Sequence, residues 1–300
     1  MESNLKKYYD RKNRISLIEK KGSVFNPNPF YLVNEFIYSS FKYKYLTDNY
    51  YDNIFNLKVL NEPNKKCLYS YDSEYNTVYS SNSKADIFAL LNVASTDRFS
   101  KKSGVIKENI GYGLNYGITD FYNKKITRDK SFFPFESFVA SVINKADSDI
   151  LAKAYFDPKF NNLSELIPDD KYDSFLELID KYHDNYLKLM KLYRYKFSEE
   201  RYYFNLVYGE TLRKRNIKLH ELEDKINKLE SENYTIVYDI LDNLVEFISN
   251  NDELTNKKKK ECFAFMSTKL EKLLSKDELF YLNELNDTFK SNENVKRLVK

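Results

Sequence analysis

Proline and glycine are distributed very unevenly along this chain. All six prolines lie at or before Pro168, and five of the six glycines lie at or before Gly117. Proline removes a backbone hydrogen-bond donor and glycine weakens a helix, so the chain after Pro168 can be helical almost throughout. We therefore predict an all-helical domain over residues 166–300.

The spacing of apolar residues agrees with this prediction. In one stretch they recur every three or four residues, which places them on one helical face: Leu219, Leu222, Ile226 and Leu229. The Asn-rich and Lys-rich segment 249–260 is predicted to be a loop. Ser275 with Glu278 three residues later forms a capping box, which predicts a last helix that ends near Phe289.

The first 165 residues have a mixed pattern. Short segments with β-forming residues, separated by Asn, Asp, Pro and Ser, predict strands at 30–33, 67–71 and 77–79. A helix is predicted from an N-cap at Ser83 to about Ala94, and a further apolar-periodic stretch covers 138–155. Residues 1–165 are therefore expected to form an α+β domain, mostly helical with a small sheet.

Composition excludes several classes of protein. Hydrophobic residues make up 42% and charged residues 31%, which is typical of a folded globular chain. No apolar run is long enough to span a membrane, and the basic residues 1–21 lack the apolar stretch of a secretory signal. Cys67 and Cys262 are too far apart in sequence to suggest a disulfide framework or a metal cluster. We expect a cytoplasmic protein that does not bind membranes.

Three of the six glycines are clustered at Gly111, Gly113 and Gly117. Glycine is required where the backbone has a positive φ or where two elements approach closely. The cluster predicts a loop with two glycines that leads into a short helix, with the third glycine on the helix face that packs.

Two segments around this cluster resemble a known family. Residues 88–95 read FALLNVAS and residues 110–122 read IGYGLNYGITDFY. They are similar to the core of gluzincin-type, zincin-like metallopeptidases, and more closely to zincin-like proteins of low-GC bacteria with the patterns HELFHxAS and GIGLNEGxTE. Segments 133–139 and 153–157 resemble the downstream helices of that family, so the resemblance covers about residues 65–165.

The residues that carry the chemistry of that family are missing. The resemblance places Phe88 and Asn92 where the family has its two zinc-binding histidines, Ala89 where it has the general-base glutamate, and Tyr116 where it has the third zinc ligand. A catalytic zinc needs three protein ligands with available lone pairs. The resemblance therefore implies a catalytically inactive fold with no metal, no cofactor and no catalytic residues.

Phe88 and Asn92 are one helical turn apart, so they are expected to face Tyr116 together and to fill the former metal cavity. The alternative interpretation is an amphipathic helix and a glycine-rich turn that are unrelated to zincins. His183 and His220 are 37 residues apart, not the four of an HExxH site. Both are expected to be surface or partly packed helical residues.

A second candidate is a segment rich in basic and aromatic residues at 188–218. Basic groups neutralise phosphates and aromatic rings stack on unpaired bases, so the segment could bind nucleic acid. The candidate residues are Lys191, Arg194, Lys196, Arg201, Arg213, Lys214 and Arg215. The alternative is a helix with its aromatic residues toward the core and its lysines in solvent. The net charge of the whole chain is only +3, which does not indicate a strong polyanion binder.

The sequence therefore predicts a non-enzymatic scaffold, built on an inactive metallopeptidase-like fold, that binds another protein. Two alternatives remain open. The chain could associate with nucleic acid through 188–218, or it could be an enzyme whose site the sequence does not reveal.

Overall fold

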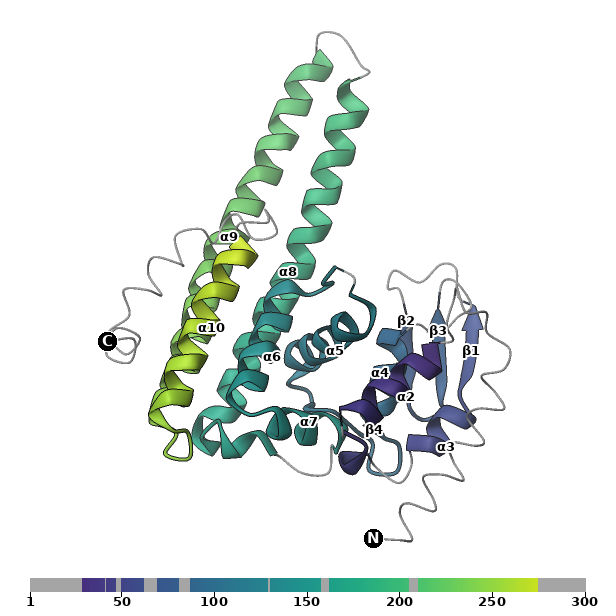
Figure 1. The fold of residues 1–300 in the computed structure, drawn as a ribbon. Coiled ribbons are helices and arrows are strands. Elements are labelled where there is room, and N and C mark those ends of the chain that lie inside the picture. Colours follow the sequence, from purple (N-terminus) through teal and green to yellow (C-terminus); the bar gives the residue numbers. More distant parts are fainter. Residues whose placement is uncertain are drawn as a thin grey trace, which may run out of the picture.

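The structure is a computed structural model that describes residues 29–40, 42–46, 50–61, 69–80, 87–128, 130–157, 162–204 and 210–274. Most of these residues are helical, and a small sheet lies at one side (Figure 1). This mostly helical fold with a small sheet confirms the coarse prediction. The elements are α2 (Pro29–Ser39), η1 (Lys42–Tyr45), α3 (Tyr50–Phe55), β1 (Lys58–Asn61), β2 (Tyr69–Asp72), β3 (Thr77–Ser80), α4 (Ile87–Ala94), β4 (Thr96–Asp97), β5 (Lys102–Ser103), α5 (Tyr112–Thr127), α6 (Pro134–Ala146), α7 (Ser148–Phe156), η2 (Asn162–Glu165), α8 (Asp169–Phe204), α9 (Glu210–Asn250) and α10 (Asn256–Leu274).

The main sheet has three strands in the order β1-β3-β2. β3 pairs in parallel with β1 and antiparallel with β2, so β3 is the central strand. Val78 of β3 is fully buried and packs against Ala89 and Val93 of α4. The sheet therefore holds α4 from the side opposite to the helical core.

The prediction of a strand at 30–33 is wrong, because these residues belong to helix α2. Pro29 occupies the first position of α2, where its fixed φ favours a helix and its missing N–H costs nothing. Val33 and Ile37, four residues apart, are both fully buried on one face. Packing of that face outweighs the β propensity of the local residues. The strand at 77–79 is confirmed, and the strand at 67–71 is confirmed from Tyr69 onward.

Two helix boundaries also differ from the prediction. The stretch 138–155 is divided at Asp147, whose carboxylate accepts hydrogen bonds from the backbone N–H groups of Asp149 and Ile150 and so begins α7. The loop expected at 249–260 is shorter, because α9 continues to Asn250 and α10 begins at Asn256. The predicted N-cap at Ser83 and the predicted helix after Ser275 lie outside the described residues.

From Asp169 to Leu274, the described elements are helices only, as predicted. They do not pack separately from the preceding part of the chain. One cluster of buried apolar side chains extends from Val33 in α2 to Leu270 in α10 and crosses the predicted boundary between residues 165 and 166. The division into an α+β domain and a helical domain stays a prediction.

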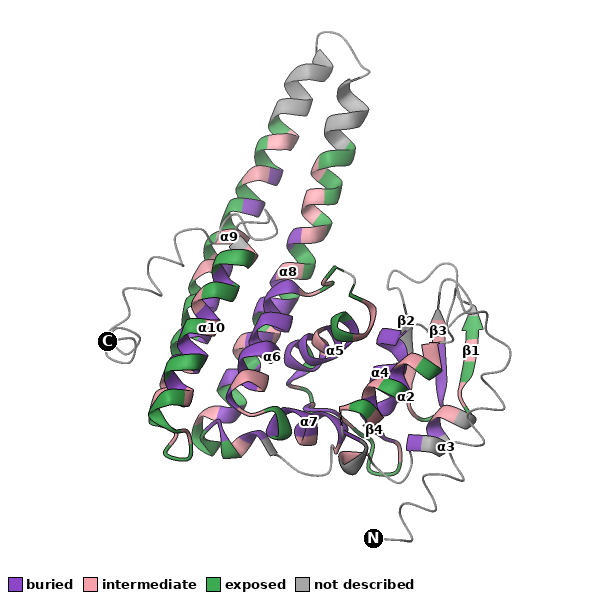
Figure 2. Cartoon of the chain, viewed as in Figure 1, coloured by how far each residue is buried: buried purple, intermediate pink, exposed green. Residues whose placement is uncertain are grey.

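Helices α8 and α9 form a long antiparallel hairpin of 36 and 41 residues. Their outer parts extend well beyond the rest of the fold (Figure 1). Buried residues of α8 are concentrated where α5 and α6 lie beside it, and exposed residues increase toward the tip (Figure 2). We call residues 187–204 and 210–228 of this hairpin the arm. Leu189, Leu222 and Ile226 are buried there and hold its two helices together.

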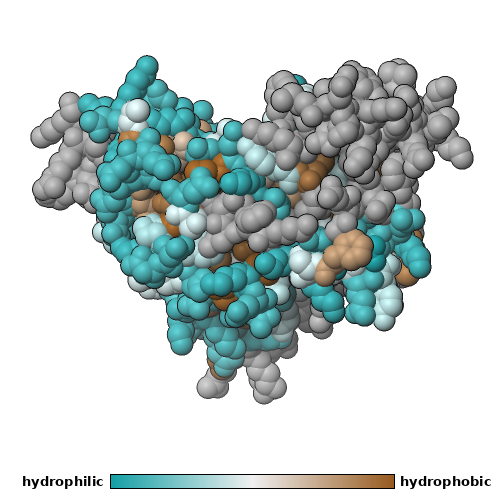
Figure 3. Space-filling model, turned by 90° about the horizontal axis from the view of Figure 1, so that it is seen from below, coloured by the Kyte–Doolittle hydropathy of each residue, from teal (hydrophilic) through white to brown (hydrophobic). Residues whose placement is uncertain are grey.

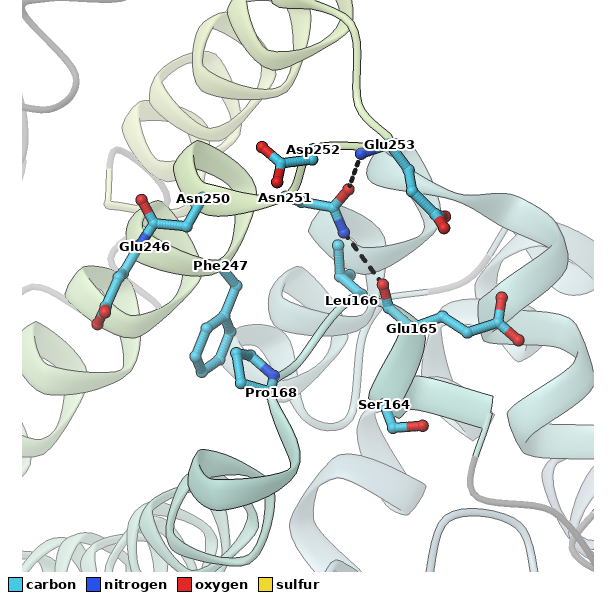
Figure 4. A pocket seen from close by; sticks show the side chains of 10 residues that line it. All are labelled: Ser164, Glu165, Leu166, Pro168, Glu246, Phe247, Asn250, Asn251, Asp252 and Glu253. Atoms are coloured by element: carbon cyan, nitrogen blue, oxygen red, sulfur yellow. Dashed lines mark hydrogen bonds between the residues drawn. The ribbon is translucent and has the colours of Figure 1, made fainter.

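The base of the hairpin is tied to the body by Asn251 (Figure 4). Its side-chain amide donates a hydrogen bond to the carbonyl of Glu165 at 3.0 Å, and its side-chain oxygen accepts from the backbone N–H of Glu253 at 2.9 Å. The cleft around Asn251 has a volume of about 260 Å³ and contains several carboxylates. Those of Glu246 and Glu253 point to opposite sides, so the cleft does not gather them around one ligand position (Figure 4).

Among the described helices, none contains a stretch long and apolar enough to cross a membrane.

Candidate functional site

Two glycines of α5 bring three helices into close contact. A methyl group on Gly113 would lie 2.7 Å from the carbonyl oxygen of Ile179 in α8, and one on Gly117 would overlap the carbonyl group of Glu136 in α6. Gly111, just before the helix, has a φ of 94°. Both predicted uses of glycine, a positive φ and a close approach of two elements, are therefore present. The prediction placed one glycine inside the helix, but α5 begins at Tyr112 and so contains two, Gly113 and Gly117.

Phe88 and Tyr116 come together at this junction. Their rings are stacked with centroids 6.3 Å apart and an interplanar angle of 22°. Asn92 lies one turn from Phe88 in α4, a helix whose residues are all buried. The contact of Phe88 with Tyr116 is part of the geometry expected from the sequence, whereas Asn92 is hydrogen-bonded to Asn115 and Thr119 of α5. Ala89 points elsewhere, because it packs with Val78 and Val93 against the sheet.

More aromatic rings surround this pair. Phe133 lies 6.0 Å from Phe88 and 5.4 Å from Tyr116 between ring centroids, and Phe132 meets Phe88 edge-on at 5.9 Å. The volume next to Phe88 is therefore occupied by packed aromatic side chains, whose contacts stabilise the junction of α4, α5 and the start of α6. Phe132 and Phe133 could not be assigned to this cluster from local spacing.

Asn92 takes part in a buried polar network. Its Oδ1 accepts weak hydrogen bonds at 3.4 Å from the side chains of Asn115 and Thr119. The Thr119 hydroxyl lies 2.7 Å from that of Tyr155, and burial raises the pKa of this tyrosine. Since these groups are out of water, each needs an internal partner. The network gives Asn92 a role in joining α4 to α5.

His183 is the residue that sequence reasoning misjudged. It is buried, and its Nδ1 is hydrogen-bonded at 2.8 Å to Oε1 of Glu136, which is fully buried. The imidazole is stacked on Tyr116 with centroids 5.1 Å apart, and the Phe133 ring lies 5.0 Å away. The hydrogen bond and the two rings fix the orientation of the imidazole.

No sequence signal connects His183 to Glu136, because they are 47 residues apart and meet only when α8 packs beside α6. His183 contacts Tyr116 directly, although the two residues lie on opposite sides of the predicted boundary between residues 165 and 166. His220 is exposed on α9, as expected.

A cleft of about 350 Å³ opens beside His183 and Tyr116. Its other lining residues are Asn109, Tyr112, Asp180, Asp184 and Leu187. Asp180 accepts hydrogen bonds from the backbone N–H groups of Gly111 and Gly113 at 2.7 and 2.6 Å, and burial raises the pKa of its carboxyl group. Asp180 thus attaches α8 to the N-terminus of α5. Among these lining residues none is Ser, Thr or Cys, and the hydroxyl groups in the lining belong to Tyr112 and Tyr116.

Within the described part of the chain there is no group of three or more His, Cys, Asp or Glu residues that could hold a metal ion. The absence of a metal from the protein stays a prediction. Protein purified without chelator is expected to contain no stoichiometric zinc, and added zinc or EDTA is expected to leave its melting temperature unchanged. Metal analysis that found about one tightly held zinc per chain would contradict this, and that zinc should also raise the melting temperature by mass action.

The structure describes only part of the basic-aromatic segment. Lys191 and Arg194 are exposed on α8, one turn apart, while Lys196 forms an ion pair with Glu223 of α9 at 2.9 Å. Tyr193 is hydrogen-bonded to Glu230 of α9. The side chains of Arg201, Arg213, Lys214 and Arg215 lie outside the described residues. Part of the segment thus joins the two helices of the arm, and part faces solvent.

Comparison of this chain with protein-family models, with curated proteins and with solved structures finds no match.

Proposed function

We propose that this chain is a non-enzymatic scaffold that binds another protein through the arm of the α8–α9 hairpin. The observation that carries the proposal is the exposure of large apolar residues on the arm. Phe197 is 65% exposed, Ile217 54% and Tyr195 42%. Exposed aromatic and aliphatic side chains on a rigid helical surface are typical anchors of protein interfaces.

In the view of Figure 3, the described residues at the opposite end of the molecule present less apolar surface to a partner. Figure 3 shows its base, where hydrophilic residues cover most of the described surface and hydrophobic residues appear in small, separate areas. A projecting hairpin is also accessible from several sides. A partner with a groove or with a helical surface can therefore bind along it.

We further propose that the body is an inactive, zincin-like fold. The proposal rests on the resemblance of residues 88–95 and 110–122 and is supported by the packing of Phe88 against Tyr116. Aromatic rings at these positions supply no metal ligands, and Ala89 supplies no base. In this proposal the body holds the arm in position and does not catalyse a reaction.

A pull-down from the native cell with the tagged full-length chain tests the scaffold proposal. The double variant Phe197→Ser, Ile217→Ser removes the two most exposed apolar residues of the arm among those described. The control is Phe99→Ser, because Phe99 is 83% exposed and lies outside the arm. We expect one protein partner to be recovered with wild type and control, and its recovery to fall about tenfold or more with the double variant.

The pull-down is repeated after nuclease treatment. Recovery that survives nuclease and depends on Phe197 and Ile217 supports the scaffold. Equal recovery by the double variant would contradict binding through the arm. Loss of all bound material on nuclease treatment would favour the nucleic-acid alternative, in which exposed Lys191 and Arg194 contact phosphates.

A further inference from the structure

A third cleft lies where α6 is flanked by α5 and α10, and Figure 1 shows this arrangement of the three helices. Its volume is about 480 Å³, within the range of small-molecule sites. Its floor is one stripe of α6 that includes Ser137, Ser141 and Asn144. Small side chains at the first two positions leave the hollow between the two flanking helices.

The cleft is strongly basic. Its lining contains five lysines, contributed by all three helices: Lys124, Lys125, Lys145, Lys258 and Lys269. None of the lining residues is Asp or Glu. Carboxylates just outside the lining also contact lining residues. Glu261 pairs with Lys145 at 3.2 Å, and Asp120 accepts hydrogen bonds from Ser131 and two backbone N–H groups. The lining itself therefore carries only positive formal charge, and Glu261, beside Lys145 and Lys258, is a neighbouring carboxylate.

The same cleft has aromatic walls. Phe121 comes from α5, Phe138 from α6 and Phe265 from α10. The Lys125 ammonium group lies 4.2 Å from the centre of the Phe121 ring. Burial, together with the positive charge of Lys42, lowers the pKa of Lys125. An anion bound beside Lys125 would offset both effects, because it supplies the opposite charge that the site lacks.

One polar atom in the floor is also unsatisfied. Oδ1 of Asn144 is buried and has no hydrogen-bond partner among the described residues. A buried acceptor without a donor is costly, so a ligand N–H group that met Oδ1 after rotation of the side-chain amide toward the cleft would be favoured. The cleft thus combines positive charge, aromatic faces and one unpaired acceptor.

We propose that this cleft binds a nucleoside phosphate. The lysines would hold the phosphate groups, the phenylalanine rings would provide a face for the base, and Asn144 would accept a hydrogen bond from an N–H group of the base. Neither a simple inorganic anion nor an uncharged aromatic molecule would use all three features. The proposal concerns binding alone and is independent of the arm.

Isothermal titration calorimetry on the full-length chain tests this, with ATP as the probe and with pyrophosphate and adenosine as separate titrants. We expect saturable binding of ATP at one site per chain, binding of pyrophosphate at least about tenfold weaker, and no detectable binding of adenosine. The double variant Lys124→Gln, Lys258→Gln should weaken ATP binding about tenfold or more, because it removes two charge-assisted contacts.

The matched control is Lys225→Gln, Lys228→Gln, which removes the same charge from exposed positions on α9. It should leave ATP affinity within about twofold of wild type, which lies inside the usual effect of exposed surface substitutions. Equal weakening in both double variants would overturn the proposal, because binding would then follow net charge. Absence of saturable ATP binding, or equal affinity for ATP and pyrophosphate, would also overturn it.

Discussion

Replacement of Gly117 by alanine is expected to destabilise the protein by about 3 kcal/mol. The added methyl group would overlap the carbonyl carbon and oxygen of Glu136, which are backbone atoms and cannot rotate away. α5 and α6 would have to separate, although alanine returns about 1 kcal/mol of helix propensity. Thermal unfolding followed by circular dichroism should show a melting temperature lower by on the order of 5 to 10 °C.

Asn227→Ala provides the control for helix propensity. Asn227 is exposed on α9, so alanine there improves the helix without a clash, and the melting temperature should stay the same or rise slightly. A Gly117→Ala protein that unfolded at the temperature of the wild type would show that α5 and α6 are not in the close contact described here.

Replacement of His183 by alanine is expected to destabilise the protein by about 3 to 5 kcal/mol. The carboxyl group of Glu136 is fully buried, and His183 is its hydrogen-bond partner. Without the imidazole, that group would be left in an apolar environment, and a cavity would open between Tyr116 and Phe133. Urea unfolding at neutral pH measures the loss.

Four further variants, one of them the single variant Glu136→Ala, separate the hydrogen bond from other effects. His183→Asn should lose less stability than His183→Ala, because the amide N–H group can donate to Glu136. The free energy of unfolding of the double variant Glu136→Ala, His183→Ala should fall by less than the sum of the losses in the two single variants. Each single variant leaves one partner buried without the other, whereas the double variant removes both. His220→Ala should be close to neutral, since His220 is exposed. If His183→Ala kept wild-type stability, the pair would not hold α6 to α8.

Features of the fold that depend on local residues could be predicted from the sequence. The lack of proline after Pro168 indicated the helices from Asp169 to Leu274, since no residue there removes a backbone donor. The cluster at Gly111, Gly113 and Gly117 indicated one positive φ and close helix contacts. The helical spacing of Phe88 and Asn92 placed both on one face of α4. Each of these follows from the conformations that a residue permits or from helical geometry.

The contacts that define both candidate sites depend on the tertiary structure. His183 and Glu136 share no motif, and they meet because Gly117 lets α6 approach α5 while Gly113 does the same for α8. The basic cleft likewise unites lysines from α5, α6 and α10. Tertiary packing also turned residues 30–33 into helix, because burial of Val33 and Ile37 outweighed local β propensity. Local conformation is set by neighbours in sequence, whereas a site joins distant residues and is decided by which helix faces can pack closely.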